Sequence, residues 1–181
     1  MFKKIFLVLG VTGLASILLF HCSRKPDYSD VRPWFNPTLD TETRLDSLLA
    51  AMTLEEKVAQ MMDNAPAIER LGIPQYGWWN ECLHGVARSG LATVFPQAIG
   101  MAATWDEDLI FRLATVISDE GRAKHHQYVR EGKRGIYQGL TFWTPNINIF
   151  RDPRWGRGME TWGEDPYLTG EITVRAVKSL Q

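Results

Sequence analysis

Two segments of the sequence concentrate the side chains that could do chemistry. The first, 79–86 (WNECLHGV), places an acid and a histidine close to a tryptophan. The second, 150–164, holds three arginines, three acids and two tryptophans, interrupted by glycines and a proline. A guanidinium donates from a planar fork, a carboxylate accepts hydrogen bonds, and an indole offers a flat apolar face. This combination suits sugar rings, whose faces are apolar and whose edges carry hydroxyls.

Composition alone leaves a plainer interpretation open, because surface segments rich in arginine and aspartate often only form ion pairs. The net charge is −1 and charges of both signs are interspersed, so nothing indicates a nucleic-acid partner or an acidic substrate. Tryptophan is also a large core residue. For Trp78, Trp79 and Trp155 we therefore favour packing over ligand contact.

Both segments follow stretches that have the character of strands. Residues 75–81 are aromatic and end in polar groups, and 140–150 alternates asparagine with isoleucine. Pro145 opposes a regular central strand, so the expected strand is 139–143, with Trp143 at its end. In βα architectures the loops after the strands build the site, which makes both segments functional candidates.

Helix signals surround these strands. The spacing of apolar residues predicts a helix over 39–51, and Thr53 with Glu56 forms a capping-box pattern that starts another. We expect Val58, Met61 and Met62 to form the buried face of that second helix, the methionines as core filler rather than metal or cofactor contacts.

Two more helices are predicted further along the chain. Residues 104–107 (TWDE) form a second capping-box pattern before a helix that reaches about 126. Asp165 and Pro166 supply an N-cap and a first-turn proline for a helix that runs toward the C-terminus. Helices alternating with strands predict an α/β fold with a parallel sheet. A (β/α)8 barrel takes at least ~200 residues, so we expect a truncated barrel or a smaller open fold.

The N-terminus has the pattern of an export signal. Lys3 and Lys4 precede an apolar stretch, 5–20, that is shorter than the ~20 residues of a membrane-spanning helix, and Cys22 follows it. This resembles a bacterial lipoprotein processing site, although His21 departs from the usual small residue. We predict a signal peptide over 1–21, a tether over 22–37, and an exported protein lipid-anchored in the periplasm or outer membrane through Cys22. An uncleaved anchor or an ordinary secretory signal remains the alternative.

Cys82 is the only other cysteine in the sequence. If Cys22 is acylated, no disulfide can form. We favour packing over reactivity for the Cys82 thiol.

The motifs resemble a known family. YGWWNECLHGV (76–86), FPQAIGMAATWD (95–106) and TPNINIFRDPRWGRGMETWGEDPYLTGE (144–171) look like the N-terminal barrel domain of glycoside hydrolase family 3, and the first resembles its β-xylosidase branch. The resemblance covers 38–181. It implies the N-terminal portion of a (β/α)8 TIM-like barrel, hydrolysis of terminal β-linked xylose or glucose, an oligosaccharide or an aryl or alkyl β-glycoside as substrate, and no cofactor.

The resemblance also implies binding roles. The acidic residue two before the Leu-His pair, Glu81, and the arginine of the Trp-Gly-Arg element, Arg157, would hold the terminal sugar. Trp143 is a candidate ring contact at the expected strand end. The family's Lys-His pair, aspartate nucleophile and glutamate acid/base do not occur in the expected context. Lys124 and His125 precede the arginine motif and are not assigned that role. We therefore name no catalytic residue and expect no turnover by this chain alone.

Two other classes of function are considered. A sugar-binding lipoprotein without catalysis would keep Glu81 and Arg157 as a partial pocket. A metalloprotein could use Glu81 and His84, whose spacing occurs in di-iron helix bundles, but such bundles need a second pair on long helices. We predict no metal site.

Overall fold

A computed structural model of the chain describes residues 31–181, which divide into two units at Met52. The expected signal peptide (1–21), the anchor residue Cys22 and most of the expected tether (22–37) lie outside the described residues. Within 31–181, no helix combines the length and the apolar character that crossing a membrane requires.

The first unit contains a short 3-10 helix, η1 (Pro33–Phe35), and the helix α2 (Thr41–Ala51). Asp40 caps α2, because its side chain accepts a hydrogen bond from the backbone N–H of Thr43 at 2.9 Å. The helix predicted over 39–51 is thus confirmed, with its first turn starting two residues later. Arg44 Nε donates to the carbonyl of Trp34 at 3.1 Å and ties the two elements together.

The second unit begins with α3 (Leu54–Ala59), whose start is the predicted capping box. Thr53 accepts from the N–H of Glu56, and Glu56 accepts from the N–H of Thr53. The predicted buried face is wrong, however: Val58 is 62% exposed and Met61 is 85% exposed. The helix ends at Ala59, so Met61 and Met62 lie in the following turn and do not continue its face.

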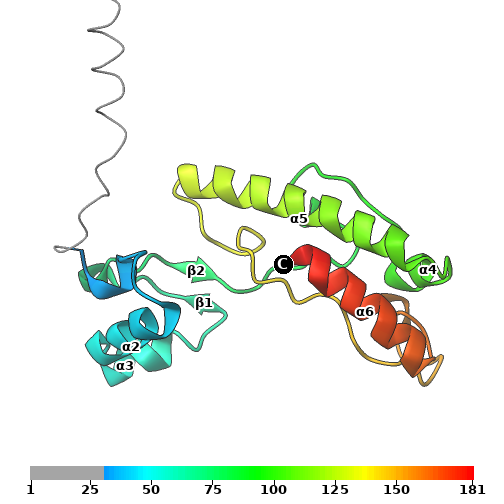
Figure 1. The fold of residues 1–181 in the computed structure, drawn as a ribbon, viewed down its shortest axis with the longest axis horizontal. Helices are drawn as coiled ribbons and strands as arrows, with labels where there is room; N and C mark the ends of the chain where they lie inside the picture. The colour runs from blue at the N-terminus through cyan, green and yellow to red at the C-terminus, as the bar shows by residue number, and fades with distance from the viewer. Residues whose placement is uncertain (1–30) are drawn as a thin grey trace, which may run out of the picture. The chain divides into compact units, whose positions relative to one another are not determined.

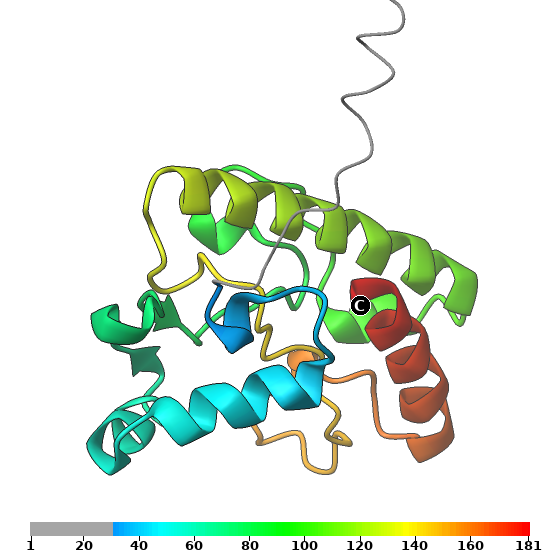
Figure 2. The same cartoon turned by 60° about the vertical axis from the view of Figure 1, so that its left-hand side comes forward.

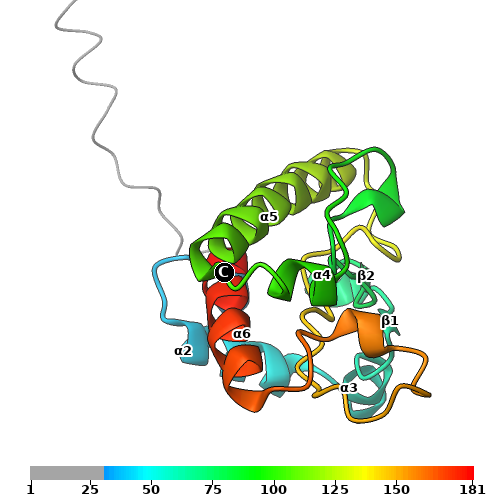
Figure 3. The ribbon, with the colours of Figure 1, turned by 90° about the vertical axis from the view of Figure 1, so that its right-hand side faces the viewer.

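The core of the second unit lies among α4 (Ala98–Ala102), α5 (Glu107–Arg130) and α6 (Pro166–Leu180). Helices α5 and α6 pack side by side (Figures 1 and 3). Ile110 and Ile172 are fully buried between them, and Trp162 covers the same cluster. Glu107 and Arg175 form an ion pair across the two helices at 3.0 Å. Burying this apolar surface is the main contribution to the stability of the unit.

The starts of the two long helices test the capping predictions. Asp165 accepts from the N–H of Leu168 at 2.7 Å and Pro166 occupies the first turn, which confirms the prediction for α6. For α5 the predicted cap is wrong. Asp106, not Thr104, caps the helix by accepting from the N–H of Leu109. The Thr104 hydroxyl instead donates to the carbonyl of Met101 at 2.7 Å, at the end of α4.

The predicted parallel sheet is largely absent from the described residues. The only sheet there pairs β1 (Asn64–Ala65) with β2 (Tyr76–Gly77), and the pairing is antiparallel. The strand expected over 139–143 contributes a single parallel bridge between Asn80 and Phe142. Beyond it the backbone N–H of Cys82 donates to the Thr144 hydroxyl rather than to a carbonyl, and Pro145 has no N–H, so the ladder stops.

The remaining elements are short 3-10 helices in loops: η2 (Glu69–Leu71), η3 (Ala87–Ser89) and η4 (Gly158–Glu160). Figure 2 traces the long connection over 131–165, from the end of α5 to the start of α6. The second unit is therefore a helical core with long loops and few strands.

Candidate functional site

One cavity in the second unit brings the predicted site residues together. Its volume is about 440 Å³, within the usual range for small-molecule sites. The lining comes from loops on either side of the Asn80–Phe142 bridge, from η3, and from η4 with the residue before it. It consists of Trp79, Glu81, Leu83, Arg88, Tyr137, Trp143, Thr144, Asn146, Arg157 and Glu160. Glu81, Trp143 and Arg157, predicted from different parts of the sequence, thus line the same cavity.

Asn80 holds two of these loops in register. It is buried, its side-chain amide donates to the Gly77 carbonyl at 3.0 Å, and its oxygen accepts from the N–H of Gly139 at 2.8 Å. Gly139 has no room for a side chain, since a Cβ would lie 2.5 Å from the Tyr76 hydroxyl. Asn80 is not among the site residues predicted from the sequence. The one local signal for it is that it is a polar residue within an aromatic segment.

Glu81 follows this anchor and is held at both oxygens. Oε1 accepts from Arg88 Nε at 3.0 Å, and Oε2 accepts from the backbone N–H of Leu83 at 3.4 Å. The side chain of Glu81 is 25% exposed, so it faces the cavity without being sealed from solvent. A carboxylate in this position can still accept hydrogen bonds through its remaining lone pairs.

Trp143 presents an aromatic face. Its backbone N–H donates to the carbonyl of Asn80, and its indole N–H donates to the carbonyl of Trp78, both at 2.9 Å. The ring stacks on Trp79, with centroids 5.0 Å apart, and is 64% exposed. Trp79, expected to pack rather than touch a ligand, does pack on Trp143, but it is also 45% exposed and lines the cavity. Because the indole N–H of Trp143 is engaged, its free contribution is the ring face.

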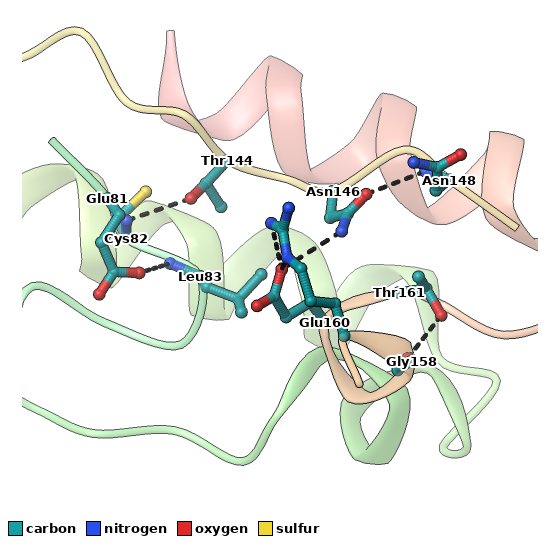
Figure 4. A network of polar contacts seen from close by, with 10 residues as sticks. Glu81, Cys82, Leu83, Thr144, Asn146, Asn148, Gly158, Glu160 and Thr161 are labelled. Carbon is teal, nitrogen blue, oxygen red and sulfur yellow. Dashed lines mark hydrogen bonds and ion pairs between the residues drawn. The ribbon is translucent and has the colours of Figure 1, made fainter. Parts of the chain in front are cut away.

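Arg157 lies directly before η4 and pairs with Glu160 on that turn. Arg157 Nε donates to Glu160 Oε2 at 2.8 Å, and Asn146 Nδ2 donates to the same oxygen at 3.3 Å. Figure 4 shows Asn146, in the loop after Trp143, facing Glu160 on η4. The hydrogen bond from Arg157 holds the pKa of Glu160 below its usual value. Glu160 therefore stays ionised at neutral pH and is unsuited to proton donation.

The Cys82 thiol is buried next to this cavity wall. Burial raises its pKa to about 12, with a smaller contribution in the same direction from the charge of Glu81 and an opposing one from Thr144. A thiol with this pKa carries almost no thiolate near neutral pH. The predicted packing role of Cys82 is confirmed.

His84, considered for a metal site, and His125, considered as part of a Lys-His pair, both have other partners. His84 Nδ1 lies 3.1 Å from the carbonyl of Phe95, while Glu81 binds Arg88. His125 Nδ1 lies 2.8 Å from the carbonyl of Gln138. Among residues 31–181, no three histidine, cysteine, aspartate or glutamate side chains gather closely enough to hold a metal ion.

The cavity therefore combines two carboxylates, two guanidinium groups and stacked indoles, which together can bind a polyhydroxylated ring. The family model described as "Glycosyl hydrolase family 3 N terminal domain" matches residues 45–181. The chain belongs to glycoside hydrolase family 3. In the full-length members this domain is of the TIM-barrel type.

Relatives that are similar in sequence include β-xylosidases. The chain is 49% identical over 151 residues to a xylan 1,4-β-xylosidase of Xylanibacter ruminicola, which covers 82% of this chain and 18% of the relative. It is 48% identical to a probable exo-1,4-β-xylosidase of Aspergillus terreus, with coverages of 80% and 19%. This chain thus spans about a fifth of the length of these relatives.

A solved structure supports the same grouping. A family 3 exo-β-xylosidase in complex with a xylobiose aziridine activity-based probe superimposes with a TM-score of 0.72 at 33% identity. The match covers 88% of this chain and 21% of that one. The similarity therefore extends over most of the present chain and over a minor part of the enzyme.

Proposed function

We propose that this chain supplies part of the site that holds the terminal non-reducing sugar of a β-xyloside, in a full-length protein that hydrolyses it. The observation that carries the proposal is the convergence of Glu81, Trp143 and Arg157 on one cavity. The names of the similar proteins support xylosides over glucosides. The catalytic label belongs to the full-length protein.

The three residues have complementary roles in this proposal. Glu81 accepts hydrogen bonds from adjacent hydroxyls, and Arg157 donates to others from its forked guanidinium. The exposed face of Trp143 packs against the apolar face of the ring. Together they fix the orientation of the sugar, which lowers the entropic cost of bringing it to the reacting groups.

Binding of methyl β-D-xyloside to the 181-residue chain tests the proposal. Titration followed by NMR should shift the indole N–H signals of Trp79 and Trp143 and leave that of Trp105, which lies outside the cavity lining. Glu81→Gln and Arg157→Lys should each weaken binding about tenfold. Arg154→Lys is the matched control, because Arg154 pairs with Asp152 and does not line the cavity.

Three outcomes would contradict the proposal. They are no shift of the cavity indoles, unchanged affinity in Glu81→Gln, and an equal loss of affinity in Arg154→Lys. Retained helical circular dichroism in each variant shows that a loss of binding is not a loss of fold.

The absence of turnover by this chain alone is part of the proposal. We expect no hydrolysis of aryl β-xylosides or aryl β-glucosides by the 181-residue chain, and robust hydrolysis would contradict it. Reading the nucleotide sequence past codon 181 separates a longer hydrolase from a sugar-binding lipoprotein without catalysis. The hydrolase would encode the family's Lys-His pair and then its aspartate nucleophile in a Ser-Asp-Trp motif.

Export and lipid anchoring at Cys22 are also proposed, on the sequence pattern alone. Inhibition of lipoprotein signal peptidase should leave a larger precursor, and Cys22→Ser should abolish incorporation of labelled fatty acid. Unchanged mobility under the inhibitor would rule out lipoprotein processing.

A further inference from the structure

Arg88 also lines the cavity, and none of the binding roles above uses it. Its Nε donates to Glu81 Oε1 at 3.0 Å, and its guanidinium lies over the ring of Tyr137, 5.6 Å from the ring centroid. Arg88 is thus fixed at one end by a carboxylate and along its face by an aromatic ring. Lysine can also lie over an aromatic ring, but only the planar guanidinium offers several donors in a fixed fork while its face lies against a ring.

The backbone that carries Arg88 is pinned to helix α5. The next residue, Ser89, receives hydrogen bonds on its carbonyl from Lys124 Nζ and from the Tyr128 hydroxyl, both at 2.8 Å. On the other side, Val86 is buried in the core. The turn η3 therefore offers Arg88 a rigid base.

Tyr137 is held in a similarly defined place. Its backbone N–H donates to the carbonyl of Trp79 at 3.0 Å, and its φ of +60° is uncommon for a residue with a large side chain. This contact ties the ring under Arg88 to the stacked indoles of the cavity.

A second cavity beside Glu81 gives its carboxylate another space into which it could turn. This cavity has a volume of about 250 Å³ and is lined by His84 and Val94 together with Glu81 and Arg88. Glu81 and Arg88 line both cavities, so their ion pair borders each of them. Without Arg88, the carboxylate has space to rotate away from the larger cavity.

The energetics favour orientation over stability as the role of the pair. The side chain of Arg88 is 63% exposed, and ion pairs exposed to this degree contribute little to folding. We propose that Arg88, backed by the Tyr137 ring, is a positioning residue that directs the Glu81 carboxylate into the larger cavity. This inference rests on the proposed role of Glu81 in sugar binding.

A double-mutant cycle tests the coupling on binding of methyl β-D-xyloside. Arg88→Ala should weaken binding about tenfold, with no further loss when it is added to Glu81→Gln. Arg88→Lys should restore only part of the loss, since a lysine ammonium is a point charge on a flexible stem and lacks the planar fork that meets the carboxylate and the ring together. Tyr137→Leu should also weaken binding, and Tyr137→Phe should restore it. Arg154→Ala is the matched control and should bind as the unaltered chain does.

The outcomes separate this inference from the proposed function. If Glu81→Gln loses affinity and Arg88→Ala does not, or if their losses add fully, the positioning role is wrong and the sugar site stands. If Glu81→Gln keeps its affinity, the proposed function fails. An equal loss in Arg154→Ala would show that the loss is not specific to Arg88.

The orientation of Glu81 can also be measured without sugar, so the positioning role of Arg88 can be tested even if the chain binds no xyloside. Side-chain couplings of Glu81 by NMR, or a crystal structure of Arg88→Ala, report the orientation of the carboxylate directly. We expect Glu81 to turn toward the cavity lined by His84 in this variant, with the thermal unfolding midpoint unchanged. An unchanged Glu81 orientation would overturn the inference.

Discussion

The indole rings of Trp79 and Trp143 stack with their centroids 5.0 Å apart and their planes inclined by 27°. Each tryptophan keeps the other from turning, and both stand at the wall of the cavity. Trp79, inside the first loop motif, and Trp143, directly before the second, thus make a single aromatic surface. Offset stacking of this kind is worth about 0.5–1.5 kcal/mol beyond the burial of its area.

Removing the Trp143 ring should weaken xyloside binding. Trp143→Ala deletes the proposed sugar-stacking face and leaves Trp79 without its partner, so affinity should fall about tenfold. Calorimetric titration with methyl β-D-xyloside measures this. Trp105→Ala removes another exposed indole, 73% accessible and outside the cavity, and should bind as the unaltered chain does. Equal losses in the two variants would contradict the assignment.

Replacing Glu160 by glutamine should loosen Arg157. The pKa of Glu160 is lowered by its hydrogen bond from Arg157 relative to an ordinary value of 4.5. The stabilisation from the ionised pair is therefore fully present above pH 4.5 and is lost as the pH falls through the lower, folded value. The Arg157 Nε–H signal in NMR should stay constant as the pH falls to 4.5, and should move only at the lower pH where Glu160 takes up its proton in the folded chain. In Glu160→Gln the signal should already be displaced at pH 7. A constant signal in that variant would show that the pair does not fix Arg157.

A methyl group at position 158 should destabilise the turn that follows Arg157. A Cβ on Gly158 would lie 2.4 Å from the Phe150 ring, so Gly158→Ala should lower the free energy of unfolding by about 1–3 kcal/mol through overpacking. Urea unfolding measures the difference. Gly156→Ala is the matched control two residues away, because nothing lies within 4 Å of a Cβ there. Similar values for the two variants would contradict the contact.

The buried thiol of Cys82 should make stability fall at high pH. Its folded pKa, about 12, lies above the ordinary value of 9.0, so the unfolded chain loses this proton first. The stabilisation is fully present below pH 9.0 and is lost progressively toward pH 12. The slope from this one group approaches about 1.4 kcal/mol per pH unit. Urea unfolding at pH 8 and pH 10.5 should show a larger difference for the unaltered chain than for Cys82→Ala. Equal differences would show that the thiol does not titrate in this way.

The sequence predicted the start of a helix correctly where the capping side chain had only one hydrogen-bond partner within reach. Thr53 with Glu56, and Asp165 with Pro166, act as predicted because cap and partner lie within a single turn. Thr104 failed because the end of α4 offered its hydroxyl a carbonyl, leaving Asp106 to cap α5. That competition depends on where a preceding helix ends, which the local pattern does not encode.

The residues of the candidate site also separate into those that local sequence patterns reveal and those that only the folded structure reveals. Glu81 and Arg157 could be predicted as cavity residues because motifs of the family mark them, and Trp143 because it stands at the expected strand end. Arg88 and Tyr137 could not, because they are 49 positions apart and their relation arises only when the loops meet. The prediction of a parallel sheet failed for a related reason, because strand pairing depends on partners far along the chain. Here the Thr144 hydroxyl accepts the hydrogen bond from the Cys82 N–H that a backbone carbonyl would accept in a regular ladder.

The burial of Cys82 makes the rate of its chemical labelling a measure of how often the surrounding core opens. Cys82 is 1% exposed and packs with Val86 and Ile117, so a thiol reagent can reach it only when that part of the core opens. With Cys22 replaced by serine, the rate of labelling at mildly alkaline pH would report how often the opening occurs. A bound sugar that holds the loop carrying Glu81 and Cys82 closed would slow this reaction, and ligand binding could be followed without any added chromophore in the cavity.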